Sequence, residues 1–336
     1  MPIELGDDEQ AYLTNEAPAS FADMLGTAAY RCAAAAMRLG VFAALRDGPL
    51  APAGLASAAG VDARGVTILA DALVSFGYLS SSENGYALTP LSDKWLVDSP
   101  YTTVELFWQR VMFELWDGLE DSVRTGKPSV GFYQWLAERP ETSGQFQSML
   151  DGHARLLAAE LAPLIPVPPG PARLLDLGGG HGRYSTALCE RHPSLTATVM
   201  DFPSALGPGG ERVTMVPADY LTADLGTGYD VVLLFNVLHG HPEAGNRALL
   251  ARVAAAMNPG GVVAILEHGR DAPGPADVSF LRTFSLNLFH GQNGEVYALD
   301  RIADWLSDFR EVTTTQLRES PTQYLITAVA QSRGAG

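Results

Sequence analysis

The stretch RLLDLGGGHGRYSTALCERH, residues 173–192, decides the fold of this chain. It opens with an apolar run typical of a buried strand, passes through four glycines between positions 178 and 182, and continues with a helical pattern. Glycines at such a point let the backbone turn sharply and let a ligand approach peptide groups that a Cβ atom would block. A strand, a glycine-rich loop and a helix in this order predict an α/β sheet that binds a ligand at the carboxyl ends of its strands.

Further apolar, β-branched runs follow this first unit. Helical stretches such as residues 181–192 and 243–257 separate them. Strands that alternate with helices predict a Rossmann-like α/β fold whose parallel sheet is covered on both faces. The Pro-rich segment PVPPGPA, residues 166–172, is a stiff hinge, so we expect this domain to span residues 166–336. The further runs are ATVMD (197–201), VTMVPAD (213–219), DVVLLFNV (230–237) and GGVVAILEH (260–268).

Residues 1–100 have a different pattern, which predicts a winged helix. Residues 20–97 read as short helices followed by a hairpin, whose apolar arms flank Glu83-Asn84-Gly85. A winged helix usually suggests DNA binding, but this segment holds 12 Asp and Glu against 5 Lys and Arg, so we expect a dimerisation domain. Residues 101–165 are mostly helical and rich in aromatic side chains, and we expect a connector that forms a pocket wall or interdomain core.

The composition argues against several classes of protein. The net charge of −16 would repel the phosphate backbone of a nucleic acid, and no stripe of Lys and Arg overcomes it. No apolar run is long enough to span a membrane, and the N-terminal MPIELGDDEQ is acidic where a signal peptide is basic. Cys32 and Cys189 lie far apart, with neither a disulfide pattern nor zinc-ligand spacing. We therefore expect a cytoplasmic protein that binds neither nucleic acid nor membrane and keeps its thiols reduced.

Acidic side chains around the glycine loop indicate which nucleoside binds there. The loop reads GGGxG and lacks the third glycine of the GxGxxG pattern, which a nicotinamide oxidoreductase would need to seat a pyrophosphate. Asp176 just before the loop would repel a pyrophosphate but suits a cationic sulfonium. Asp201 ends the second strand, where a carboxylate can accept both ribose hydroxyls, and Asp219-Tyr220 follows the third strand, placed for an adenine. These carboxylates favour S-adenosylmethionine (SAM) as the ligand.

With these motifs the chain resembles the plant-type small-molecule O-methyltransferases, a family common in bacterial natural-product pathways. The resemblance extends over nearly the whole chain and includes LLDLGGGHG, VMDFPSAL, PADYL, NVLH and MNPGGVVAILE. It implies a homodimer formed through the N-terminal domain and a SAM-dependent methyltransferase domain. The cofactor residues that it implies are Gly178, Gly180 and Gly182 for the methionine part, Asp201 and Phe202 for ribose and adenine, and Asp219 with Tyr220 for adenine.

The segment LLFNVLHGHPEAG, residues 233–245, contains the candidate catalytic base. In the family this strand end carries His-Asp-Trp, and the His removes a proton from a hydroxyl group. His239 matches that His, whereas the next two residues are Gly and His rather than Asp and Trp. Glu267 and Glu295 match acids that flank the catalytic His in the family, although Glu267 can also be interpreted as a residue that only ends a strand.

The replacement of Asp and Trp by Gly240 and His241 favours a second interpretation, a metal site. In an extended segment, residues two apart project to the same side, so His239 and His241 could present imidazoles to one point. His290 in LNLFHGQNGEVY is a third candidate, and three imidazoles with open coordination positions suit Fe, Ni, Co or Zn. A narrower resemblance, to phenylpyruvate-type C-methyltransferases that hold a metal at similar places, implies metal-assisted C-methylation beside the keto group of a 2-oxo acid through an enolate.

The sequence leaves alternatives open. Without a metal, His239 would act as the general base in O-methylation of a phenol or hydroxyl, with His241 an exposed loop residue and His290 a hydrogen-bonded pocket residue. A regulatory protein that senses SAM would need a basic recognition helix, which residues 1–100 lack. Some proteins of this scaffold use SAM for hydroxylation or pericyclic chemistry. Our main hypothesis from the sequence is metal-assisted C-methylation of a small metabolite, and metal-free O-methylation is its rival.

Overall fold

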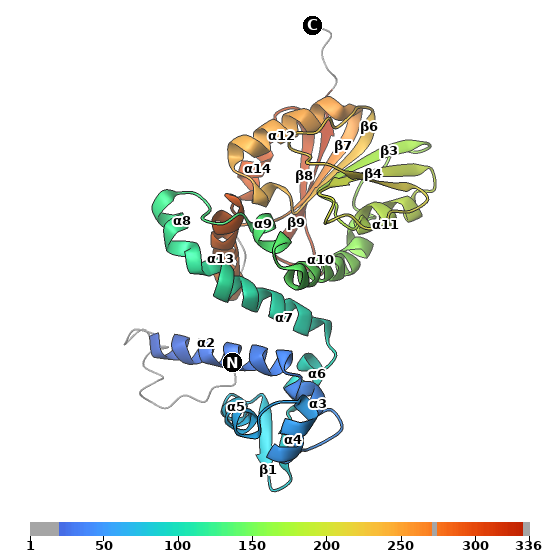
Figure 1. The fold of residues 1–336 in the computed structure, drawn as a ribbon. Helices are drawn as coiled ribbons and strands as arrows, with labels where there is room; N and C mark the ends of the chain where they lie inside the picture. Colours follow the sequence, from blue (N-terminus) through green and yellow to red (C-terminus); the bar gives the residue numbers. More distant parts are fainter. Residues whose placement is uncertain (1–19, 271–273, 332–336) are drawn as a thin grey trace. The chain divides into compact units, whose positions relative to one another are not determined.

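The computed structural model describes residues 20–270 and 274–331, which fall into two compact units. The first unit comprises the described residues up to Glu114 together with Glu141–Met149, and the second comprises Leu115–Pro140 and the described residues from Leu150 onward. The segment 101–165, expected to be one connector, is therefore divided between the two units. Figure 1 shows the helical first unit and the second unit with its sheet.

The first unit is helical and carries one antiparallel hairpin, as predicted. Asp62 begins one of its helices by accepting a hydrogen bond of 2.8 Å from the main-chain N–H of Gly65. Gly85 in the hairpin has a φ of 104° and packs against the carbonyl of Leu50, so that a Cβ atom would not fit there. The elements are α2 (Ser20–Arg38), α3 (Val41–Ala44), α4 (Pro52–Ala59), α5 (Ala63–Ser75), β1 (Leu79–Ser82), β2 (Gly85–Leu88), α6 (Pro90–Leu96) and α7 (Pro100–Arg110).

The remaining helical elements follow along the chain from Val111 onward. A π-helical turn, η1 (Val111–Leu115), precedes η2 (Trp116–Gly118), α8 (Leu119–Thr125), α9 (Phe132–Ala137) and α10 (Pro140–Leu161). The later helices are α11 (Arg183–Arg191), η3 (Leu238–Gly240), α12 (Glu243–Ala256), α13 (Pro275–Gln292) and α14 (Leu299–Trp305). Within the described ranges, no helix is long and apolar enough to cross a membrane.

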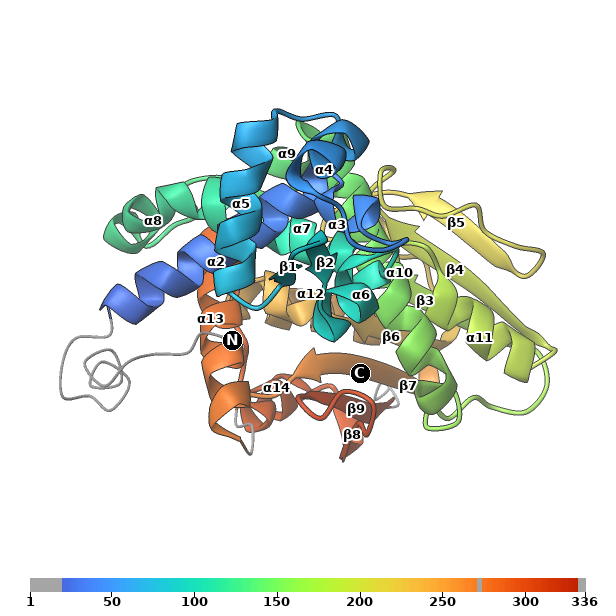
Figure 2. The same cartoon turned by 90° about the horizontal axis from the view of Figure 1, so that it is seen from below.

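The second unit is built on a seven-stranded sheet in the order β5-β4-β3-β6-β7-β9-β8. The five predicted strands pair in parallel, and the Rossmann-like α/β fold is confirmed. The sheet is not wholly parallel, because β9 pairs antiparallel with β7 and β8 antiparallel with β9, and Figure 2 shows β5 and β8 at its opposite edges. The strands are β3 (Ala172–Leu177), β4 (Leu195–Asp201), β5 (Val213–Pro217), β6 (Tyr229–Phe235), β7 (Met257–His268), β8 (Phe309–Gln316) and β9 (Gln323–Ala330).

The central strand β6 shows why the interior strands read as unbroken apolar runs. Val231 and Leu233 point into the core that α10 and α11 cover, whereas Val232 and Leu234 point into the core that α12 and α14 cover. All four side chains are fully buried, because both faces of the sheet carry helices. The chain runs from β3 to β4 on one side and later to β6 on the other, so the strand order reverses between β3 and β6. The carboxyl ends of the strands at such a point are where ligands bind.

Candidate active site

The glycine loop at the end of β3 turns through left-handed backbone conformations. Gly178, Gly180 and Gly182 have φ values of 69°, 51° and 71°. A Cβ atom on Gly178 would lie 2.8 Å from the side chain of Val237, and one on Gly182 equally close to that of Met215. Any side chain at these two positions would therefore displace a neighbour, and the tight loop leads directly into α11 at Arg183.

Asp176, at the end of β3, supplies a polar group that fits a cationic ligand. Its side chain is fully buried, and one carboxylate oxygen, Oδ2, accepts a hydrogen bond of 2.6 Å from the Ser185 hydroxyl. The other oxygen, Oδ1, is buried and has no hydrogen-bond partner among the described residues. Burial raises the pKa of Asp176 to about 7. A buried carboxylate oxygen without a partner is unfavourable, so this atom fits the positive charge that SAM carries.

Asp201 and Phe202 connect the end of β4 to the glycine loop. The Asp201 carboxylate accepts hydrogen bonds from the main-chain N–H groups of Gly180, at 2.9 Å, and Phe202, at 2.7 Å. Burial raises the pKa of Asp201. The ring of Phe202 is 38% exposed and lies 5.8 Å from that of Tyr133, centroid to centroid. Tyr133 was not singled out from the sequence as a cofactor residue, and it adds a second aromatic ring beside the predicted adenine site.

Tyr220, after β5, lies over the glycine loop and is held by His241. Its ring comes within 3.5 Å of the position that a Cβ atom on Gly178 would take. The Tyr220 hydroxyl forms a hydrogen bond of 2.9 Å with Nε2 of His241. The neighbouring Asp219 carboxylate accepts a hydrogen bond of 2.9 Å from the N–H of Leu221 and so stabilises the turn. The predicted cofactor residues are thus brought together at one edge of the sheet.

His239 follows β6 and is oriented by Glu267 from the neighbouring strand β7. Glu267 is only 2% exposed, and its Oε2 lies 2.7 Å from Nδ1 of His239. Its Oε1 accepts the main-chain N–H groups of Leu238, at 2.7 Å, and His239, at 3.2 Å. A carboxylate only accepts, so Nδ1 of the neutral ring carries the proton and Nε2 keeps its lone pair. This is the arrangement of a general base with an orienting acid.

The turn that carries His239 does not have the extended form expected from the sequence. Asn236 adopts a φ of 56°, and the next residues form the 3₁₀ turn η3. With about three residues per turn, side chains two apart point in different directions. His239 therefore turns to Glu267, whereas His241 turns to Tyr220.

The predicted three-histidine metal site is wrong, since His290 uses both ring nitrogens inside the protein. His290 is fully buried on α13. Its Nδ1 lies 2.8 Å from the Ser122 hydroxyl, and its Nε2 lies 2.7 Å from the carbonyl oxygen of Leu115. Neither nitrogen is left to bind Fe, Ni, Co or Zn, and across residues 20–270 and 274–331 no three His, Cys, Asp or Glu side chains are grouped to hold a metal ion. The alternative, a hydrogen-bonded His290, fits these contacts.

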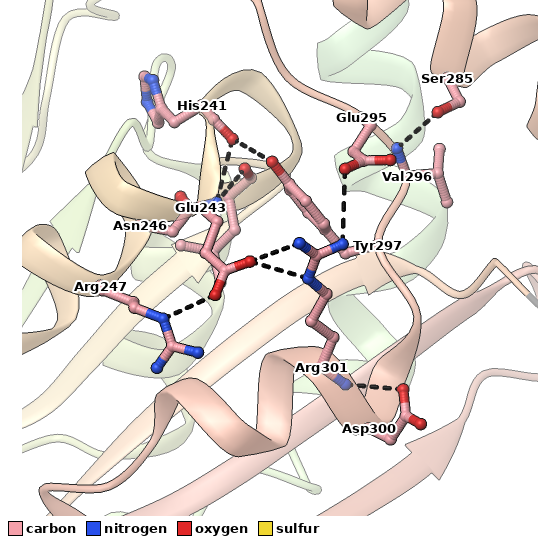
Figure 3. A network of polar contacts seen from close by, with 11 residues as sticks. His241, Glu243, Asn246, Arg247, Ser285, Glu295, Val296, Tyr297, Asp300 and Arg301 are labelled. Atoms are coloured by element: carbon pink, nitrogen blue, oxygen red, sulfur yellow. Dashed lines mark hydrogen bonds and ion pairs between the residues drawn. The ribbon is translucent and has the colours of Figure 1, made fainter.

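Glu295 belongs to a polar network behind the turn that carries His239 (Figure 3). Its Oε1 lies 3.8 Å from the guanidinium of Arg301, which also donates a hydrogen bond of 2.9 Å to Glu243. In the same network the Tyr297 hydroxyl donates to the main-chain oxygen of His241 at 2.7 Å. Glu267, and not Glu295, is therefore the acid that the structure places against the imidazole of His239.

Gly294 packs directly against the backbone of the turn that carries His239. A Cβ atom at this position would overlap the carbonyl oxygen of His239 and would lie 2.7 Å from the carbonyl carbon of Gly240. Asn293, just before it, ends α13 in the left-handed conformation, with a φ of 64°. The Asn-Gly pair thus fixes the turn from behind.

Aromatic rings line the other side of His239, which the sequence did not predict. The ring of Phe284 meets that of His239 edge-on, with centroids 5.6 Å apart. Phe280 lies one turn earlier on α13, parallel to Phe284 at 5.8 Å. His268, the last residue of β7, meets both phenyl rings edge-on. The two Phe residues are four positions apart in sequence, a helical spacing that could have indicated this wall.

The fold and the site together define a SAM-dependent methyltransferase. Residues 116–306 match the model of the O-methyltransferase domain, and residues 23–98 match that of the O-methyltransferase dimerisation domain. The chain belongs to the O-methyltransferase family, as its sequence motifs indicated.

Relatives and solved structures agree with this membership. The chain is 30% identical to the 3-hydroxy-5-methyl-1-naphthoate 3-O-methyltransferase of Streptomyces sahachiroi, over 82% of this chain and 83% of that one. It is 27% identical to the phenazine-1-carboxylate N-methyltransferase of Pseudomonas aeruginosa, over 82% and 86% of the two chains. The fold is similar to that of the mitomycin 7-O-methyltransferase MmcR, with a TM-score of 0.80 and 24% identity over 97% of this chain and 100% of that one. The structure of human N-acetylserotonin methyltransferase in complex with SAM gives a TM-score of 0.75 at 24% identity, over 98% of this chain and 100% of that one.

Proposed function

We propose that the protein methylates a hydroxyl group of a small aromatic acceptor, with SAM as the methyl donor and His239 as the general base. The observation that supports this most directly is the contact of 2.7 Å between Nδ1 of His239 and the buried carboxylate of Glu267. This contact leaves the other ring nitrogen, Nε2, with a lone pair that can accept the acceptor's proton.

The chemistry follows from that lone pair. Bound SAM supplies a methyl group on a positively charged sulfur. Nε2 of His239 takes the hydroxyl proton, and the electron pair left on the acceptor oxygen forms the new bond to the methyl carbon. The bond from that carbon to sulfur breaks, and its electrons remain on the sulfur of S-adenosylhomocysteine. The carboxylate of Glu267 stabilises the positive charge that the imidazole gains.

The residues around the glycine loop would hold the cofactor. Asp176, with its unpartnered oxygen, would face positive charge, and Asp201 would accept the ribose hydroxyls in exchange for its main-chain donors. Phe202 and Tyr220 would enclose the adenine, with Asp219 beside them. The three glycines would allow the methionine part to approach the backbone.

An aromatic acceptor is favoured by the rings beside the base. The phenyl group of Phe284 contacts His239, and a flat acceptor could stack on Phe284 and Phe280 with its hydroxyl at Nε2. A relative acts on a hydroxynaphthoate, which is an acceptor of this shape. C-methylation of a 2-oxo acid relied on three convergent imidazoles, and His290 is committed to Ser122 and Leu115 instead. We also propose a homodimer through residues 23–98, for which sedimentation should give twice the chain mass of 35.8 kDa.

Methyl transfer from SAM with a deuterated methyl group tests this function. Incubation with a panel of phenols and naphthols should give a product whose label NMR assigns to an oxygen-bound methyl group. His239→Gln should abolish the transfer while binding of S-adenosylhomocysteine stays unchanged. A product whose deuterated methyl group is bound to carbon would contradict the proposal. So would activity that disappears with a chelator and returns with a metal.

A further inference from the structure

A second imidazole, that of His268, lies beside the aromatic wall of the site. His268 directly follows Glu267 at the end of β7. Its ring centroid lies 5.5 Å from that of Phe284 and 5.9 Å from that of Phe280. His239 contacts the same Phe284 ring at 5.6 Å, so two imidazoles lie beside one phenyl group.

Thr322 holds the ring of His268. Nδ1 forms a hydrogen bond of 3.0 Å with the hydroxyl of Thr322, and the main chain of Thr322 also hydrogen-bonds the ring. No other described residue hydrogen-bonds this imidazole. The ring is therefore held in orientation by Thr322 and offers Nε2 as one polar contact next to an apolar surface.

His268 is also uncharged under the conditions in which such an enzyme works. Burial, together with the like charges that His239 and His153 would carry, lowers its pKa to about 3. A neutral ring offers a hydrogen bond to a neutral ligand without repelling a positively charged cofactor. It also cannot act as a second acid close to the base, because it takes up no proton near neutral pH.

We infer that His268 recognises the acceptor, and that the acceptor carries a second oxygen substituent besides the reacting hydroxyl. The acceptor ring would lie on Phe284 and Phe280, its reacting hydroxyl at His239 and its second oxygen at Nε2 of His268. Phe280 stacks on Phe284 one helical turn away, so the two phenyl rings form an apolar surface beside both imidazoles. This inference rests on the proposed function and adds a residue that determines which acceptors are preferred.

A purely structural role for His268 makes a different prediction. If the imidazole only packs between Phe280 and Thr322, a Phe side chain would disturb all acceptors alike. If it recognises an oxygen, Phe would weaken only acceptors that carry that oxygen. A site built to hydrogen-bond a substrate group discriminates strongly against ligands that lack it.

Binding of matched probes to the full-length protein saturated with S-adenosylhomocysteine tests the inference. The probes are 2-naphthol and the naphthalenediols that keep its hydroxyl and add a second one on the other ring. At least one diol should bind about tenfold more tightly than 2-naphthol to the unmodified protein. His268→Phe should remove this preference and leave 2-naphthol binding unchanged, and His268→Gln, which keeps a polar group, should retain part of it. His153→Phe is the matched control and should keep the full preference.

The outcomes separate the inference from the proposed function. Equal binding of all probes, no binding of any probe, or a preference that survives His268→Phe overturns the role of His268. Binding of S-adenosylhomocysteine to each variant reports that the protein is folded. Transfer of the labelled methyl group to oxygen, and its loss in His239→Gln, is scored separately, so O-methylation can succeed or fail independently of the diol preference.

Discussion

Substitution of Glu267 by Gln removes the charge that orients His239, the proposed base, and keeps the size of the side chain. The Glu267 carboxylate accepts three hydrogen bonds, from the N–H groups of Leu238 and His239 and from the ring of His239. An amide has only one acceptor oxygen, so its NH₂ group must face at least one of these donors. If the NH₂ faces the ring, the imidazole changes tautomer and Nε2 carries the proton, which stops it from acting as a base.

The size of the effect follows from two contributions. General-base catalysis supplies about 10²–10⁴-fold in rate. A hydrogen bond to a charged group is worth about 1.5–3 kcal/mol, or roughly 10- to 100-fold. Loss of the charge alone therefore slows the reaction by at least about tenfold, and the tautomer change adds most of the general-base contribution. We expect kcat to fall by at least about 10³-fold. Stability should fall by about 1–3 kcal/mol, because Glu267 is only 2% exposed.

Single-turnover rates with saturating SAM and acceptor measure the chemical step, and urea unfolding measures stability separately. Glu295→Gln is the comparison, since Glu295 is half-exposed and pairs with Arg301 at 3.8 Å. Its rate should stay within about threefold, because a surface ion pair contributes little. A folded Glu267→Gln protein whose rate stays within about threefold, or a Glu295→Gln protein that loses as much as Glu267→Gln, would show that Glu267 does not orient the base.

Three further changes test the cofactor side and the corrected histidine. Burial raises the pKa of Asp176 to about 7, so the carboxyl is mostly protonated at pH 6 and mostly ionised at pH 8. SAM affinity measured by calorimetry should therefore rise by up to about tenfold in total between these two pH values, and Asp176→Asn should give a weak, flat profile. His241→Phe loses the 2.9 Å hydrogen bond to Tyr220 and should weaken SAM binding by about 3- to 10-fold; an unchanged Kd would exclude that role. Ser122→Ala leaves Nδ1 of buried His290 without a partner and should lower stability by about 1–3 kcal/mol in urea unfolding, whether or not a chelator is present.

The inner strands and the glycine loop could be predicted, because burial on both faces of the sheet and left-handed backbone conformations each require particular residue types at particular positions. β6 is buried on both faces and so is an unbroken apolar run, and the glycines at 178, 180 and 182 adopt conformations that other residues rarely take. β8 gave no such signal, because Phe309 is its only buried residue among those described and the rest of the strand is exposed. Its antiparallel pairing with β9 arises from tertiary structure, not from its own pattern.

The histidine prediction failed for a related reason. Asn236 turns the chain after β6 and places His239 in a 3₁₀ turn, which the short apolar-to-polar transition did not reveal. The partners of His290 lie 168 and 175 residues away in sequence, at Ser122 and Leu115, so no spacing rule connects them. The contact between His239 and Glu267 agrees with the resemblance, in which an acid flanks this His, and both residues lie at the ends of neighbouring strands.

Asn293 and Gly294 lie behind the turn that carries His239. Gly294 leaves no room for a side chain against the His239 carbonyl, so backbone alone supports the turn at this point. The preceding helix, Pro275–Gln292, carries the phenyl rings of the wall. The end of this helix supports the turn through backbone, whereas the wall consists of side chains. The wall side chains can therefore be exchanged to accept differently shaped molecules while the position of the turn is kept. Libraries that vary positions 280 and 284 but leave 293 and 294 untouched should yield folded, active enzymes with altered acceptor ranges.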